Sequence, residues 1–266
     1  MENATKFREK LARGHVCLGT CITFRDPTVT DALAEVLDFV WIDMEHNPLT
    51  LADVQGHIMA TKGSDCTPLV RVGWNDSVLI KPVLDIGAAG VIAPLIQTAD
   101  DARRAVAACR YPPDGIRGFG PRRPSHYGQR GGPEFCRAMN ETVLPIVQIE
   151  HIRAVENIDA ILAVPGLTSL VIGPNDLSGS MGLMGQPRHP DVHRAIETVI
   201  KKARHHGTPV GIGIGDDPGP IAEWIDKGVN WVAMGGDFTL LLRAARQVTG
   251  QVREHAAAKQ RSRETA

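Results

Sequence analysis

Residues 144–173 read LPIVQIEHIRAVENIDAILAVPGLTSLVIG, and this stretch decides the fold class. It begins with a short apolar run, Leu144–Ile149, and ends with a second one, Ser169–Gly173. Between them, His151–Val164 carries apolar residues on one stripe at helical spacing and stops before Pro165-Gly166. Runs that are apolar throughout are expected of parallel strands covered on both faces. The stretch therefore predicts a parallel strand–helix–strand unit.

The same alternation recurs along the chain. Six further candidate strands are Val16–Ile22, Phe39–Met44, Pro68–Val72, Gly90–Leu95, Pro209–Ile214 and Trp231–Gly235. Eight strand–helix units within 266 residues predict a single (β/α)₈ barrel over residues 1–266, with a polar tail from about residue 250. An open doubly wound sheet is the alternative, and the lack of a G-x-G-x-x-G motif after the first strand speaks against it.

Several helix boundaries carry local signals. Thr98, with Asp101 three residues later, predicts a capped helix start. A helix is expected over Pro190–His206 with Gly207 just after it, and the last helix over Phe238–Thr249. The run Gly211-Ile-Gly213-Ile-Gly215 indicates either a close approach to a ligand or tight barrel packing.

Composition excludes several classes of protein. Hydrophobic residues make up 43% and charged residues 22%, and the formal net charge is −1. A balance so close to neutral argues against nucleic acid or a membrane surface as a partner. The five cysteines are odd in number and form no C-x-x-C pair, which favours reduced thiols in the cytoplasm. No signal peptide or run of 18 apolar residues is present.

The segment Tyr111–Thr142 is the longest predicted connection and contains the most basic stretch of the chain. Between residues 110 and 130 the chain has five arginines and only one acid, Asp114. The arginines are Arg110, Arg117, Arg122, Arg123 and Arg130. Long loops in compact domains are often functional, and arginine forks match carboxylates and phosphates. The segment therefore indicates either an anion-binding loop or a solvated one.

Polar residues gather where the predicted strands end, which is where barrel enzymes place their active sites. Candidates after the second, third, fifth and sixth strands are Asp43, Glu45, His46, Arg71, Gln148, Glu150, Asn175 and Asp176. Several carboxylates on one rim are costly unless a cation offsets them. Glu150 and Asp176 are hard oxygen ligands suited to Mg²⁺ or Mn²⁺, with Co²⁺ or Zn²⁺ as substitutes. The alternative is that Glu150 caps a helix and Asp176 a turn.

Two further residue types bear on the chemistry. His46 follows two acids at a strand end and is either a general base or a structural histidine. No lysine falls within a candidate strand, which argues against Schiff-base catalysis and assigns carbanion stabilisation to a metal.

The chain resembles the HpcH/HpaI-type class II pyruvate aldolases, which act on 4-hydroxy-2-oxoheptanedioate and on 2-keto-3-deoxy-sugar acids. The matching motifs run in family order from about residue 15 to residue 246. They include FVWIDMEHNPLTLADV, PLVRVGWND, RYPPDGIRGFGP, VQIEH and IGPNDLSGSMGLMGQPRHPDV. The resemblance implies a barrel of the phosphoenolpyruvate/pyruvate type and a homo-oligomer, a trimer or a hexamer that exchanges its last helix.

The resemblance also implies residue roles. Glu150 and Asp176 match the metal ligands, Arg71 the arginine on the pyruvate carbonyl oxygen, His46 the catalytic base and Asp85 its acidic partner. Further matches are Gln148 as a pyruvate contact and the backbone at Gly173, Pro174 and Asn175 as the carboxylate site. Glu45 matches a residue beside the metal-bound water, with Asp43 next to it. Arg123, or alternatively Arg122, matches an arginine delivered by a neighbouring subunit.

The expected reaction is aldol cleavage of a 4-hydroxy-2-oxo acid into pyruvate and an aldehyde. The arginine-rich loop favours an acidic aldehyde, such as a semialdehyde. Two alternatives stay open: a CoA-ester lyase of the citramalyl or malyl-CoA type, and a non-catalytic protein that binds a keto acid through a metal. A binding protein would need the metal and Arg71 but not His46.

Overall fold

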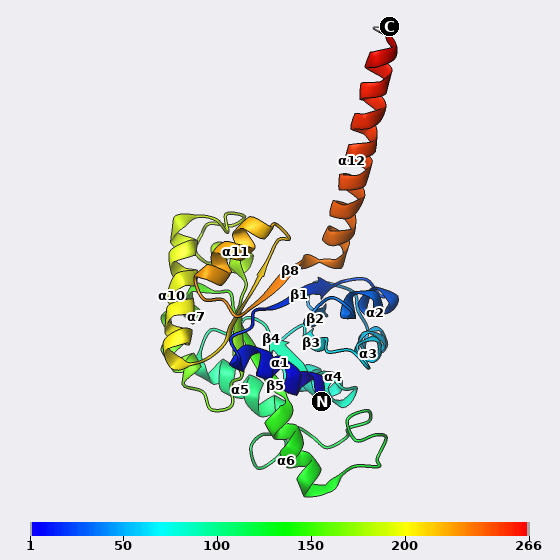
Figure 1. Cartoon of the computed structure of the whole chain (residues 1–266). Helices are drawn as coiled ribbons and strands as arrows, with labels where there is room; N and C mark the ends of the chain where they lie inside the picture. Colours follow the sequence, from blue (N-terminus) through cyan, green and yellow to red (C-terminus); the bar gives the residue numbers. More distant parts are fainter. Residues whose placement is uncertain (1, 265–266) are drawn as a thin grey trace.

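The computed structural model describes residues 2–264 and shows a closed barrel of eight parallel strands paired in chain order (Figure 1). The strands are β1 (Cys17–Ile22), β2 (Phe39–Asp43), β3 (Thr67–Arg71), β4 (Gly90–Ala93), β5 (Leu144–Ile149), β6 (Ser169–Ile172), β7 (Val210–Ile214) and β8 (Trp231–Gly236). The predicted (β/α)₈ barrel is confirmed, because β1 pairs with β8 and closes the sheet, which an open doubly wound sheet cannot do.

Helices alternate with these strands, and most of them surround the barrel. They are α1 (Glu2–Ala12), α2 (Thr28–Ala34), α3 (Leu51–Ala60), α4 (Ser77–Asp85), α5 (Ala99–Cys109), α6 (Gly132–Thr142), α7 (Ile152–Glu156), α8 (Ile158–Leu162), α9 (Pro174–Ser180), α10 (Pro190–His206), α11 (Pro218–Asp226) and α12 (Asp237–Glu264).

Local signals for helix ends are borne out where side chains make the cap. Thr98 and Asp101 form a reciprocal capping box at the start of α5. The predicted helix Pro190–His206 is confirmed as α10, and Gly207 ends it in the left-handed conformation at φ 78°.

Two helix predictions were wrong. The segment His151–Val164 is two short helices, because the backbone leaves helical geometry at Asn157, which ends α7 and begins α8. The last helix does not end at Thr249, since α12 continues to Glu264.

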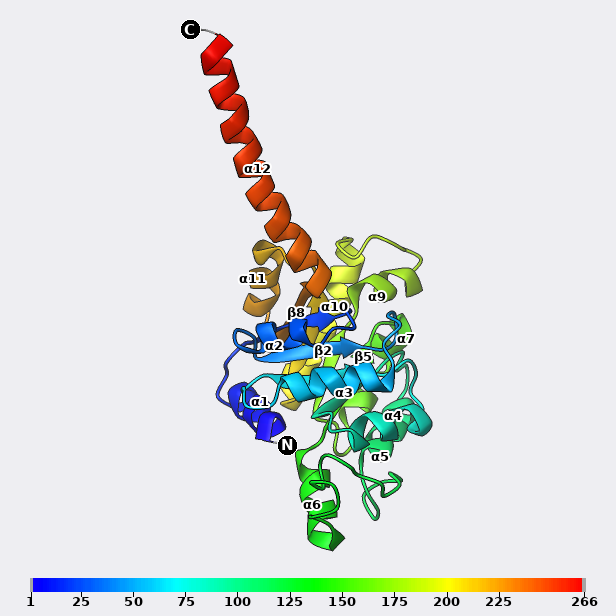
Figure 2. The same cartoon turned by 90° about the vertical axis from the view of Figure 1, so that its right-hand side faces the viewer.

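The two ends of the barrel carry different parts of the chain. Residues 111–131 and α6 lie between α5 and β5, so they stand where strands begin; Figures 1 and 2 show α6 at the end of the molecule opposite to the projecting α12. Within one chain, the arginine-rich loop therefore lies far from the catalytic candidates, which stand where the strands end.

Aromatic side chains fill the barrel at the end where strands begin. Phe7 of α1 packs edge-on against Phe39 and Trp231, with ring centroids 5.8 Å and 6.1 Å away. Gly211 makes room for Trp231, because a Cβ at Gly211 would lie 2.1 Å from the Trp231 indole. Tight barrel packing therefore explains Gly211. Within residues 2–264, no helix is long and apolar enough to cross a membrane.

Candidate active site

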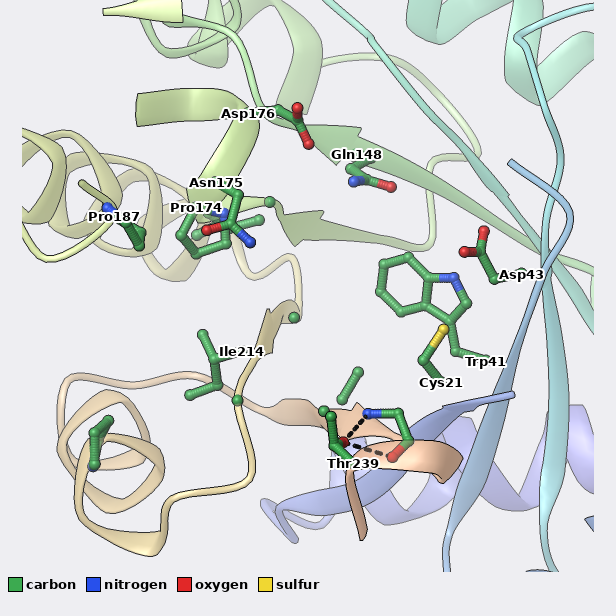
Figure 3. A pocket seen from close by; sticks show the side chains of 18 of the residues that line it. Cys21, Trp41, Asp43, Gln148, Pro174, Asn175, Asp176, Pro187, Ile214 and Thr239 are labelled. Carbon is green, nitrogen blue, oxygen red and sulfur yellow. Dashed lines mark hydrogen bonds between the residues drawn. The ribbon is translucent and has the colours of Figure 1, made fainter. Parts of the chain in front are cut away.

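A cavity of about 800 Å³ opens where the strands end (Figure 3). Its lining includes most of the predicted site residues: Asp43, His46, Arg71, Gln148, Gly173, Pro174, Asn175 and Asp176. Strands β2, β3 and β5 and the start of α9 supply them, as expected of a barrel enzyme.

Arg71 is the centre of a buried polar network at the end of β3. Its Nε donates to Asp43 Oδ1 at 2.7 Å, and its Nη1 lies 3.0 Å from Glu45 Oε2. Its guanidinium carbon stands 5.0 Å from the ring centroid of Trp41. Burial alone would lower the pKa of Arg71, but the Asp43 hydrogen bond and the neighbouring acids outweigh it and raise that pKa. Arg71 is therefore a fixed cation.

Glu150 follows β5 directly and is 2% exposed. Its Oε1 accepts from the Leu95 backbone N–H at 2.7 Å, and its Oε2 accepts from Gln148 Nε2. Burial raises the pKa of Glu150 to about 7; the Leu95 hydrogen bond opposes this rise, and the charges of Glu45 and Asp176 add to it. The surroundings of this carboxylate thus hold more negative charge than Arg71 offsets.

Asp176 stands in the first turn of α9 and faces the same cavity. No hydrogen bond or ion pair occupies its carboxylate in the described part of the chain, and it is exposed. The capping alternative fails for Glu150, because the His151 side chain caps α7 by accepting from Arg153 N. A Cβ at Gly173 would lie 2.9 Å from Glu150 Oε2, so only glycine leaves this carboxylate open toward α9.

A tight turn after β2 places His46 at the cavity and Glu45 beside Arg71. Asp43 fixes this turn by accepting from Glu45 N at 3.1 Å and from Asn47 Nδ2 at 2.7 Å. The His46 side chain is 61% exposed, and its Nε2 lies 3.7 Å from Glu45 Oε2. Burial raises the pKa of Glu45, and Arg71 opposes that rise. The turn presents an accessible imidazole to a substrate in the cavity.

Asp85 and Arg123 do not reach this cavity in their own chain. Asp85 ends α4, where strands begin, and forms a 2.8 Å ion pair with the fully buried Arg117 side chain. Arg123 lies against Gly87, which is two residues after Asp85. The backbone N–H of Arg122 donates to the Asp85 carbonyl. Their predicted roles beside His46 and the substrate stay predictions that require a second copy of the chain.

Other residues that line the cavity were not predicted from the sequence. Cys21 and Trp41 form part of the cavity wall, and Arg188, His193 and Trp224 line its far side. The period-two alternation of β1 and β2 would have placed Cys21 and Trp41 on the same barrel face as Asp43. No sequence signal marks the other three, because helix and loop packing brings them to the cavity.

In the part of the chain that the structure describes, no group of three or more His, Cys, Asp or Glu side chains could hold a metal ion. Glu150 and Asp176 could together offer two carboxylate ligands to a metal, whose remaining ligands would come from substrate and water. Open coordination of this kind suits hard divalent cations.

Comparisons with known proteins identify the family. The chain is 38% identical to a 4-hydroxy-2-oxo-heptane-1,7-dioate aldolase of Salmonella paratyphi C over 92% of each chain. It is also 38% identical to a 5-keto-4-deoxy-D-glucarate aldolase of Salmonella arizonae, over 90% of this chain and 94% of that one. A solved HpcH/HpaI aldolase/citrate lyase family protein from Burkholderia cenocepacia superposes with a TM-score of 0.88 at 33% identity, covering 92% and 98% of the two chains. The HpcH/HpaI aldolase/citrate lyase family model matches residues 24–244, and the chain belongs to that family.

Proposed function

We propose that this protein is a divalent-metal-dependent aldolase that cleaves 4-hydroxy-2-oxo acids into pyruvate and an aldehyde. The observation that carries the proposal is the buried Glu150 carboxylate, which accepts from Gln148 and whose pKa is shifted by the charges of Asp176 and Arg71; these three residues line the cavity. Relatives named as aldolases of 4-hydroxy-2-oxo-heptane-1,7-dioate and 5-keto-4-deoxy-D-glucarate support the reaction class.

The donor set fits a divalent cation. Glu150 and Asp176 would hold it. Their negative charges lie close enough to raise the Glu150 pKa, and within residues 2–264 no cationic side chain forms an ion pair with Asp176. Mg²⁺ or Mn²⁺ suits this oxygen-only set, and Co²⁺ or Zn²⁺ can substitute. When bound, the cation supplies Lewis-acid stabilisation of negative charge on the C2 oxygen.

Arg71 and Gln148 hold the keto-acid half of the substrate. Arg71 donates a guanidinium N–H to the C2 oxygen, where negative charge develops as the C3–C4 bond breaks. Asp43 and Glu45 fix the guanidinium in place, so little reorganisation accompanies the reaction. The backbone at Gly173, Pro174 and Asn175 borders the place where the substrate carboxylate is expected.

His46 acts as the general base. It removes the proton of the 4-hydroxyl, the C4–O bond becomes a carbonyl, and the C3–C4 electron pair passes into the enolate of pyruvate. The aldehyde leaves, and protonation of the enolate at C3 completes pyruvate. Asp85 would orient His46 only when supplied by another copy, since it lies at the opposite end of its own barrel.

The His46→Ala variant tests this assignment. We expect cleavage to fall about 100-fold or more, since positioned general bases contribute about that much. Binding of pyruvate, followed by calorimetry with Mn²⁺ present, should stay at the wild-type value, because Arg71, Gln148, Glu150 and Asp176 are intact. A variant with normal turnover would refute His46 as the base. Loss of pyruvate binding would instead indicate a structural role.

The proposal extends to assembly and compartment. The long α12 exposes Leu241, Leu242, Val248 and Val252, which supports burial against other copies in a trimer or hexamer. Cys17, Cys66 and Cys109 are free and buried, and burial raises the pKa of each to about 12. Inert, reduced thiols support a cytoplasmic location.

A further inference from the structure

The catalytic cavity has a second lobe that the pyruvate half of the substrate does not need. It extends from Asp176 past Asn175 to the loop between α9 and α10 and to the facing sides of α10 and α11. Figure 3 shows Pro187 and Ile214 on the side of the cavity away from Asp43 and Trp41. This distal lobe is lined by Pro187, Arg188, His193, Ile196, Ile214 and Trp224.

Arg188 is an uncommitted cation on this lobe. The other arginine of the cavity, Arg71, is held by Asp43 and Glu45. Arg188 is exposed at the rim, and no hydrogen bond or ion pair of residues 2–264 involves its side chain. It stands two residues before the first residue of α10. The positive end of that helix dipole therefore adds to the positive potential that an anion would meet there.

Two of the acids that border the lobe have other partners. The Asp217 side chain caps α11 by accepting from Gly219 N. Glu223 pairs with Lys227 at 2.7 Å. Neither neutralises Arg188, so an anionic group of a ligand would meet a free guanidinium there.

The walls between the metal ligands and Arg188 are mostly apolar. Ile196 and Trp224 are buried core residues whose surfaces border the lobe, and Ile214 faces it from the end of β7. The polar ring of this wall, His193, packs against Trp224 at a tilt of 56°, with centroids 4.9 Å apart. Such walls favour methylene groups over hydroxyl groups, because a buried hydroxyl without a partner is costly.

The bonding at C4 of the substrate directs the rest of its carbon chain toward the lobe. Carbon C4 carries both the hydroxyl that His46 would deprotonate and the chain that continues to the distal end. The two substituents must point to different walls, and His46 stands on β2's side of the cavity while the lobe lies beyond β6 and β7. The distal chain therefore has one large space open to it.

We propose that the distal lobe is a subsite for an apolar spacer ending in a carboxylate, and that Arg188 binds that carboxylate. The inference rests on the proposed function, because it takes the keto-acid end to be held by Glu150, Asp176 and Arg71. Arg188 thereby determines specificity without touching the reacting atoms.

The test compares two substrate analogues that lack the 4-hydroxyl and cannot be cleaved: 2-oxoheptanedioate and the monoacid 2-oxoheptanoate. Calorimetry with Mn²⁺ present should show that the wild-type protein binds the diacid about 5- to 10-fold more tightly, as for an ion pair at a cavity rim. Arg188→Gln should bind both alike, with monoacid affinity unchanged. Arg188→Lys should recover part of the preference, and raised salt should weaken it.

A matched control is Arg13→Gln, since Arg13 is an exposed arginine just after α1, at the other end of the barrel. Arg13→Gln should keep the wild-type preference for the diacid. Equal affinities in the wild-type protein, or an unchanged preference in Arg188→Gln, would overturn the assignment. A diacid hydroxylated at C5 and C6 that binds more tightly than 2-oxoheptanedioate would overturn the apolar spacer.

This measurement separates the two proposals. Failure of pyruvate release from every 4-hydroxy-2-oxo acid would refute the proposed function, whatever the analogues do. Normal pyruvate release with equal binding of the two analogues would refute only the subsite.

Discussion

Glu150 is a carboxylate in a place that disfavours its charge. It is buried, and its two oxygens accept from one backbone N–H and one amide, while two other acids act on it through space. A buried anion is stable only when a positive group offsets it. Arg71 is already divided between Asp43 and Glu45, so the arrangement calls for another cation.

Replacement of that carboxylate tests this reasoning. Glu150→Gln keeps a carbonyl oxygen for the Leu95 N–H but removes the charge. We expect Mn²⁺ affinity, measured by calorimetry, to fall below detection and pyruvate release to fall about 100-fold or more, as for loss of one charge-stabilising group. Glu9→Gln, on the exposed face of α1, is the control and should behave as wild type. Unchanged Mn²⁺ affinity in Glu150→Gln would exclude Glu150 as a ligand.

Among the elements, the connection from β1 to α2 is held by buried polar groups. Asp237 at the start of α12 accepts from Thr23 N and Phe24 N. His57 of α3 donates from Nε2 to the Phe24 carbonyl at 3.0 Å, and the Thr30 hydroxyl donates to its Nδ1 at 2.8 Å. Both ring nitrogens are thus used by the neutral imidazole, beside a loop whose Thr23 lines the cavity.

Burial lowers the pKa of His57 below its usual value of 6.5, and the hydrogen bond to Phe24 opposes this only in part. The unfolded chain therefore binds the proton first as pH falls, and stability that is full above about pH 6.5 is lost below it. Urea unfolding at pH 7.5, 6.5 and 5.5 should show His57→Gln with a flatter pH dependence than wild type. His205→Gln, on the surface of α10, should keep the wild-type slope; identical slopes in all three proteins would contradict the assignment.

Strand β7 and the residue that follows it offer a second test at this scale, because Gly211 and Gly215 differ in their surroundings. A Cβ at Gly211 would overlap the Trp231 indole, whereas nothing lies within 4 Å of one at Gly215. Gly211→Ala should lower the free energy of unfolding by about 1–3 kcal/mol, the usual cost of overpacking. Gly215→Ala should leave it unchanged in urea denaturation. Equal effects would mean that the Trp231 packing is not tight.

The elements differ in how well sequence alone predicts them. All eight strands follow from their apolar runs, since a parallel strand covered on both faces is expected to be mostly apolar. The break at Asn157 carries no Gly or Pro signal, so the helix over 151–164 was predicted as continuous. The prediction ended the last helix at Thr249, whereas α12 continues to Glu264. The polar α12 lacks the apolar stripe by which a packed helix is recognised in a sequence.

The candidate site divides in the same way. Asp43, Gln148, Glu150 and Asp176 were found because the ends of parallel strands meet on one rim. Arg188 and Trp224 were not, because loop and helix packing decides which of their neighbours they face. The placement of the arginine-rich loop follows from its position between a helix and the next strand.

The whole molecule places two groups of predicted site residues at opposite ends. His46, Arg71, Glu150 and Asp176 stand where strands end, while Asp85 and Arg123 stand where strands begin. If all of them serve one reaction, different copies of the chain must supply them. The catalytic unit would then be larger than one barrel.

Mixed oligomers test this consequence. In a site shared between copies, Arg123→Gln and Asp176→Asn would each inactivate a different part. Co-expressed, they should form some complete sites and regain pyruvate release above that of either variant alone. The control pair, Glu150→Gln with Asp176→Asn, has both changes in one chain's own cavity and should regain nothing. A first mixture no more active than its parents would contradict a shared site.

The most direct test of the aldolase proposal is pyruvate release after metal removal. The protein would be treated with a chelator, dialysed, and given a panel of 4-hydroxy-2-oxo acids with and without Mg²⁺ or Mn²⁺. We predict no release without metal and restored release when Mg²⁺ or Mn²⁺ returns, fastest for acids with a distal carboxylate. Release that is unaffected by the chelator, or absent with every metal while pyruvate still binds, would contradict it.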